Sequence, residues 1–117
     1  MEQALASESA AELLGWSPRL SGHTLADGTP VKAYVRFSPE GATISDLGAT
    51  LSGMGELPVA LRAAVLEISG NNDLQLDGEA LLAHLPPGGE VGEAVDRLGR
   101  ACAQISRTAS ADASPPP

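Results

Sequence analysis

Hydrophobic and polar positions alternate without interruption between residues 31 and 37. A period of two indicates a β-strand with one face in the core and the other in water. The buried face is assigned to Val31, Ala33, Val35 and Phe37, and the exposed face to Lys32, Tyr34 and Arg36. This strand fixes a sheet as part of the predicted fold.

Turn residues on both sides of this strand predict two partners for it. The loop 26–30 contains Asp27-Gly28, a dipeptide typical of tight turns, and predicts an earlier strand at 19–25. The stretch 38–41 has proline in its second position and glycine in its fourth, as a type I turn prefers, and predicts a third strand at 42–45. We therefore expect an antiparallel meander with Val35, Phe37 and Ile44 facing the core.

Three helices are predicted before and after this meander. Residues 2–14 form a helix with a poor apolar stripe, and residues 47–55 form a short helix. The third helix, 58–69, begins at a proline and is apolar on two opposite faces. Since a helix that is apolar on both sides is normally covered on both sides, we expect this one to be central and buried.

The last part of the chain predicts a hairpin and a long helix. Residues 74–85 contain a second Asp-Gly turn and form a small hairpin, although 80–85 could equally be one helical turn. The sequence Pro-Pro-Gly-Gly at 86–89 interrupts regular secondary structure and precedes an amphipathic helix at 90–109. Its apolar stripe has spacings of 4, 3, 4 and 3 and consists of Val91, Val95, Leu98, Cys102 and Ile105.

Together these elements predict an α+β fold, in which a small antiparallel sheet of three to five strands is packed on one face by helices. Residues 1–109 form a single globular domain, and residues 110–117 form a disordered, proline-rich tail. One cysteine cannot form an intramolecular disulfide, and the chain has no apolar run of membrane-spanning length. We expect a cytoplasmic protein with no contact to a membrane.

The net charge of −8 argues against direct binding to nucleic acid, which requires a cationic surface. The acidic excess is concentrated in residues 38–90, where eight acidic side chains face one basic side chain, Arg62. Such an excess either gives solubility or forms a face for a basic partner. The candidate residues for that face are Glu40, Glu56, Asp73, Asp77 and Glu79.

Two short motifs resemble those of a bacterial family, the domain of unknown function 1828. They are Ile44-Ser45-Asp46-Leu47-Gly48-Ala49-Thr50-Leu51 and Leu76-Asp77-Gly78-Glu79-Ala80-Leu81, and the likeness extends over residues 13–109. The family often has a second acid beside the aspartate of the first motif, where this chain has Leu47. The resemblance implies no established activity. Its members are small bacterial, phage-associated or mobile-element-associated proteins, which implies a regulatory or defence-related setting.

The side chains that could carry chemistry do not assemble into a catalytic pattern. Asp46 ends a strand before a helix, so its carboxylate is predicted to be a structural cap, with a catalytic or metal-binding role as the alternative. His23 and His84 have no partners at metal-ligand spacing, and Cys102 lies within an apolar stripe. We therefore expect no catalytic residue, no metal and no cofactor.

Two further surfaces are candidates for binding. Lys32, Tyr34 and Arg36 share the exposed strand face, and Arg19 is expected to join them from the neighbouring strand. The stripe in the last helix either lies in the core or forms the contact of a homodimer.

The leading hypothesis is a non-catalytic, regulatory binding protein whose partner is a protein, either basic or nucleic-acid-binding. One specific form is an anti-CRISPR-like inhibitor of a nucleic-acid-handling defence complex. The alternative is a nucleotide- or metal-dependent enzyme, or a ligand-binding module, that uses Asp46 with Tyr34 and Arg36.

Overall fold

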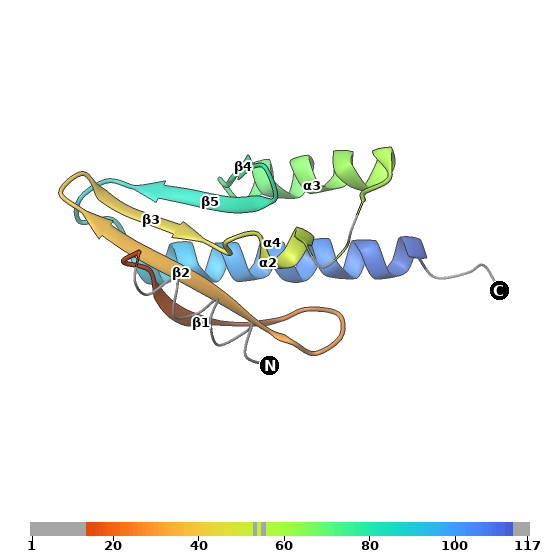
Figure 1. Ribbon diagram of the computed structural model, residues 1–117, viewed down its shortest axis with the longest axis horizontal. Coiled ribbons are helices and arrows are strands. Elements are labelled where there is room, and N and C mark those ends of the chain that lie inside the picture. The colour runs from red at the N-terminus through yellow and green to blue at the C-terminus, as the bar shows by residue number, and fades with distance from the viewer. Residues whose placement is uncertain (1–13, 53, 55, 114–117) are drawn as a thin grey trace.

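The computed structural model describes residues 14–52, 54 and 56–113, and these form five strands and three helices (Figure 1). The strands are β1 (Ser17–Thr24), β2 (Pro30–Ser38), β3 (Gly41–Ser45), β4 (Gln75–Asp77) and β5 (Ala80–Leu85). The helices are α2 (Ala49–Ser52), α3 (Val59–Asn71) and α4 (Val91–Ala113). All neighbouring strands are antiparallel, and their order in the sheet is β1-β2-β3-β5-β4. The prediction of an α+β fold with an antiparallel sheet is confirmed.

The sheet buries the face that the alternation at 31–37 predicts. Val31, Ala33 and Val35 of β2 are buried, and Ile44, directly opposite Val35 on β3, is buried as well. The hairpin at 74–85 consists of β4 and β5, so residues 80–85 form a strand and not a helical turn. Helix α4 lies along this buried face and closes the core (Figure 1).

The apolar stripe of α4 is part of that core. Val95, Leu98, Cys102 and Ile105 are all buried within the chain. The homodimer contact considered for this stripe is therefore wrong, because its side chains already pack against the sheet. At Gly99 the helix approaches β1 so closely that a Cβ atom would overlap the side chain of Ser21.

Two expectations about burial are wrong. Phe37 is 61% exposed, since it lies at the end of β2, where it lines a shallow groove with Pro87 and Val91 at the start of α4. Helix α3 is not buried on both faces, because the described elements that it mainly contacts, α4 and β4, cover one side of it. Val59 and Leu66 on the other side are 87% and 56% exposed.

Two predicted boundaries also differ. The short helix begins at Ala49 and not at residue 47, because Leu47 and Gly48 both have positive φ angles, of 54° and 82°. Helix α4 continues to Ala113, so residues 110–113 of the predicted tail are helical. The predicted helix at 2–14 and the tail residues 114–117 lie essentially outside the described residues.

Candidate functional site

The carboxylate of Asp46 is buried at the junction of β3, α2 and β5. β3 ends at Ser45, and the left-handed turn through Leu47 and Gly48 bends the chain back over the aspartate. Oδ1 accepts hydrogen bonds from the backbone N–H groups of Gly48 at 2.9 Å and Leu81 at 3.0 Å, and Oδ2 accepts one from Thr50 at 3.2 Å. Asp46 is only 1% exposed, so these donors replace the water it would otherwise bind.

This geometry leaves Asp46 without a free face for a substrate or a metal. Its oxygens satisfy N–H groups in the first turn of α2, which have no partner within the helix, and one N–H group of β5. Tyr34 lies opposite Ser45 and Arg36 opposite Thr43, so Tyr34 and Arg36 are on the face of the sheet opposite Val35, Ile44 and the core. The alternative site that joined Asp46 with Tyr34 and Arg36 is therefore wrong, because the sheet separates them.

The single thiol is next to this buried carboxylate. The sulfur of Cys102 lies 3.8 Å from Oδ2 of Asp46. Burial, followed by the negative charge of Asp46, raises the pKa of Cys102 to about 12. Because the thiolate is the nucleophilic form, Cys102 is an inert structural thiol at neutral pH.

The cationic strand face contains three of the four residues expected there. The register of β1 and β2 puts Pro18 opposite Tyr34 and Leu20 opposite Lys32. Arg19 lies opposite Ala33 and hence on the other face, so its assignment to this surface is wrong. The guanidinium of Arg36 stacks on Trp16, with its central carbon 4.6 Å from the ring centroid.

The five acidic candidates do not form one patch. Glu40 lies in the β2–β3 turn, at the Leu85 end of β5, whereas Glu79 immediately precedes the start of that strand. The length of β5 separates these two ends by about 20 Å. Asp73 lies 3.5 Å from the guanidinium of Arg97 on α4. Glu56 and Glu79 line a common groove of about 440 Å³ together with Arg62, and Asp77 is the last residue of β4.

Each histidine contacts one polar side chain of a neighbouring element. Nε2 of His23 lies 2.9 Å from Oδ1 of Asp96 on α4, and His84 contacts the hydroxyl of Thr43 at 3.2 Å. The described residues contain no group of three His, Cys, Asp or Glu side chains placed to hold an ion. No helix in the same part of the chain has the length and apolar character needed to cross a membrane.

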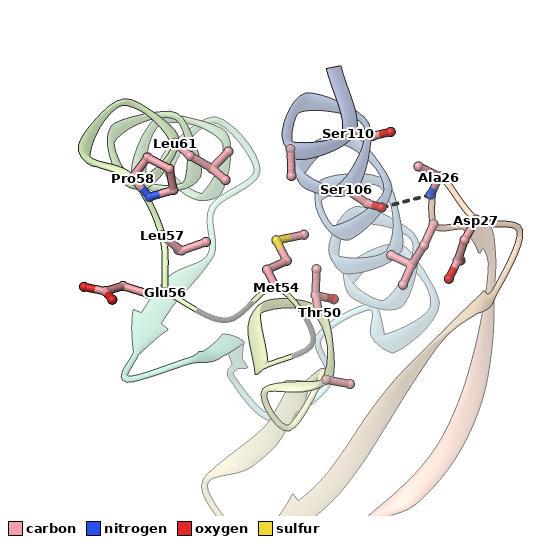
Figure 2. A pocket seen from close by; sticks show the side chains of 13 residues that line it. Ala26, Asp27, Thr50, Met54, Glu56, Leu57, Pro58, Leu61, Ser106 and Ser110 are labelled. Atoms are coloured by element: carbon pink, nitrogen blue, oxygen red, sulfur yellow. Dashed lines mark hydrogen bonds between the residues drawn. The ribbon is translucent and has the colours of Figure 1, made fainter. Parts of the chain in front are cut away.

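A larger groove lies between the end of α4, the start of α3 and the loop that joins β1 to β2 (Figure 2). Its volume of about 640 Å³ is within the range usual for ligand and side-chain binding sites. We call it the apolar groove. Its apolar lining residues are Leu25, Ala26, Ala49, Met54, Leu57, Pro58, Leu61 and Ala109.

The charged side chains that line the apolar groove are negative. Among the described residues that line it, the charged ones are Asp27 and Glu56, and both are exposed acids. Hydrogen bonds from Thr29 lower the pKa of Asp27, so its carboxylate is ionised at neutral pH. Ser106 accepts a hydrogen bond from the N–H of Ala26 at 2.9 Å and thereby holds the β1–β2 loop against α4 (Figure 2).

The sequence did not reveal this groove because its walls come from three stretches that are far apart along the chain, 25–27, 49–61 and 106–110. The one local sign was the run 54–58, where apolar Met54, Leu57 and Pro58 surround the acidic Glu56. Comparison of the chain with protein-family models, with curated proteins and with solved structures finds no match.

Proposed function

We propose that this protein is a non-catalytic binding protein that holds an apolar side chain of a basic protein partner in the apolar groove. The observation that carries the proposal is the combination of an apolar floor with two acidic groups, Asp27 and Glu56, at its rim. The apolar side chain of the partner contributes affinity because its surface is removed from water. Lysine or arginine residues beside it would be attracted to the acidic groups at the rim of the groove.

A binding role fits the state of the reactive groups better than catalysis does. Both oxygens of Asp46 are occupied by backbone N–H groups, and the thiol of Cys102 is buried and protonated. Neither residue lines the apolar groove. The groove thus offers surface, shape and negative potential, which suit recognition of another macromolecule.

The net charge of the chain favours one class of partner over another. With a net charge of −8, direct contact with nucleic acid is unfavourable, whereas proteins that handle nucleic acid present basic surfaces. We propose a regulatory role against such a partner, of which inhibition of a defence complex in the anti-CRISPR manner is one form. A single cysteine that cannot form an internal disulfide supports the assignment of this activity to the cytoplasm.

Selection of peptides from a random phage-displayed library against the full chain tests the groove. We expect the selected peptides to contain a large apolar residue flanked by lysine or arginine. Their binding, followed by fluorescence anisotropy, should be lost in Ala109→Trp, which fills the groove from α4. The matched control is Gln104→Trp, which adds the same side chain to an exposed position on α4 outside the groove.

The charge of the rim is tested with the same peptides. Glu56→Lys should weaken binding about tenfold, and added salt should weaken binding to the wild type more than to this variant. Two results would contradict the proposal: selected peptides without basic residues, or binding that survives Ala109→Trp.

A further inference from the structure

Helix α3 carries an exposed stripe of apolar and small residues opposite its buried side, and Leu66 in this stripe also borders the groove of about 440 Å³ that Leu51 of α2 and Leu76 of β4 line. Val59 and Leu66 are 87% and 56% exposed, and Ala63 and Gly70 between and beyond them are exposed as well. The buried side of the same helix, with Leu61, Val65 and Ile68, is diametrically opposite. We call Val59, Ala63, Leu66 and Gly70 the α3 stripe.

The spacing of the α3 stripe is that of a helix–helix contact. The intervals of 4, 3 and 4 residues correspond to successive d, a, d and a positions of a heptad repeat. Val59 and Leu66 occupy the d positions, and the small residues Ala63 and Gly70 occupy the a positions. Since small a residues allow two helices to approach closely, the larger d side chains can interdigitate across the contact.

The charges beside the stripe are self-complementary. In the same heptad, Arg62 is at a g position and Glu67 is at the following e position, on opposite sides of the stripe. Both are exposed, and neither forms an ion pair within the described part of the chain. When two such helices pair in parallel around a twofold axis, Arg62 of each copy faces Glu67 of the other.

We propose that two copies of this chain associate through α3, in parallel, with the α3 stripe as the contact and two reciprocal Arg62–Glu67 pairs at its sides. Arg62 is the only lysine or arginine between positions 38 and 90, so no other permanently cationic side chain of this region could pair with Glu67 at the contact. No residue of the stripe lines the apolar groove, so this dimer leaves the groove open.

The contact is small. Helix α3 has 13 residues, which corresponds to a length of about 20 Å. An interface of this size lies at the low end for specific protein complexes. The dimer therefore forms reversibly and depends on concentration.

Sedimentation equilibrium of the full chain at increasing concentration tests the association. We expect the mass to rise from 11.9 kDa towards twice that value. Leu66→Glu should remain monomeric, whereas Gln104→Glu, a change of equal charge on exposed α4, should behave as the wild type. Because Leu66 is outside the core, thermal unfolding of the variant should be unchanged at low concentration.

Two further variants test the parallel arrangement. Arg62→Glu should weaken the dimer at least tenfold, and Arg62→Glu combined with Glu67→Arg should restore it. Val59→Cys should form an intermolecular disulfide on mild oxidation, because d positions face each other in a parallel pair. In an antiparallel pair centred on the stripe, the two copies of residue 59 would be about 16 Å apart, too far for a disulfide.

These experiments distinguish the existence of the dimer from its parallel arrangement. A wild-type chain that is monomeric at about 1 mM, or a dimer that Leu66→Glu leaves intact, overturns the proposal. A dimer that Leu66→Glu abolishes but that neither cross-links through Val59→Cys nor responds to the charge exchange overturns the parallel arrangement. None of these results depends on peptide binding to the apolar groove.

Discussion

Asp46 and Leu81 are joined by two hydrogen bonds across 35 residues of sequence. The N–H of Asp46 donates to the carbonyl of Leu81 at 3.2 Å, and the N–H of Leu81 donates to Oδ1 of Asp46 at 3.0 Å. The second bond uses a side chain where a sheet would normally use a carbonyl. This exchange lets β3 end and α2 begin while β5 stays attached to the sheet.

Asp46→Asn should lower the free energy of unfolding by about 1–3 kcal/mol, because the amide replaces one acceptor oxygen with a donor that faces backbone N–H groups. Urea unfolding measures this change. Asp77→Asn is the matched control, since Asp77 is exposed at the end of β4, and it should alter stability by less than about 0.5 kcal/mol. Equal effects of the two substitutions would show that the buried carboxylate is not structural.

Cys102 should be unreactive in the native protein. Its pKa of about 12 leaves almost no thiolate at pH 8, and its sulfur is buried under α4. Native protein should react with a disulfide reagent far more slowly than protein in urea, with a rate set by unfolding. Rapid native labelling would contradict this account of the site.

Two glycines of α4 should respond with opposite signs to the same substitution. Gly99→Ala forces a methyl group against Ser21 and His23 of β1 and should destabilise the protein by about 1–3 kcal/mol. Gly92→Ala meets no atom within 4 Å and should stabilise the helix by up to about 1 kcal/mol. Thermal unfolding of both variants measures the difference, and a gain of stability in both would show that β1 does not press on α4.

The contact of His23 with Asp96 should make stability depend on pH. The hydrogen bond from His23 is the main cause that lowers the pKa of Asp96 from 3.8, and the charges of His23 and Arg100 add to it. The folded state therefore binds this proton less readily than the unfolded state, so the contribution is complete above pH 3.8 and is lost as the pH falls below that value. Asp96→Asn should lower the melting temperature at pH 6, with a difference that shrinks towards pH 2.5 as Asp96 becomes protonated.

Most of the fold could be predicted from local patterns, because those patterns record which side of an element is buried. The alternation at 31–37 and the stripe of α4 each describe one face, and both faces are in the core. The errors arise where a sequence pattern does not show which other element packs against the apolar face. Phe37 continues the buried face of β2 beyond the cover of α4, and α3 has a second apolar face that is exposed in the described part of the chain.

The sites were harder to predict than the fold for the same physical reason. The side of β1 that faces outward depends on its register with β2. In this register Arg19 lies on the face of the sheet opposite Lys32, Tyr34 and Arg36. The apolar groove depends on three distant stretches of the chain meeting near the end of α4. Neither relationship has a period or a motif along the sequence.

The stacking of Arg36 on Trp16 gives this protein an optical reporter at one edge of the sheet. Trp16 is the only tryptophan of the chain, and it lies just before β1. Its fluorescence therefore reports on the contact between the start of β1 and β2, while circular dichroism follows mainly the long terminal helix. If the edge strand peels away before the helix melts, the two spectroscopic transitions will separate, and the order in which the molecule comes apart can be read without adding a label.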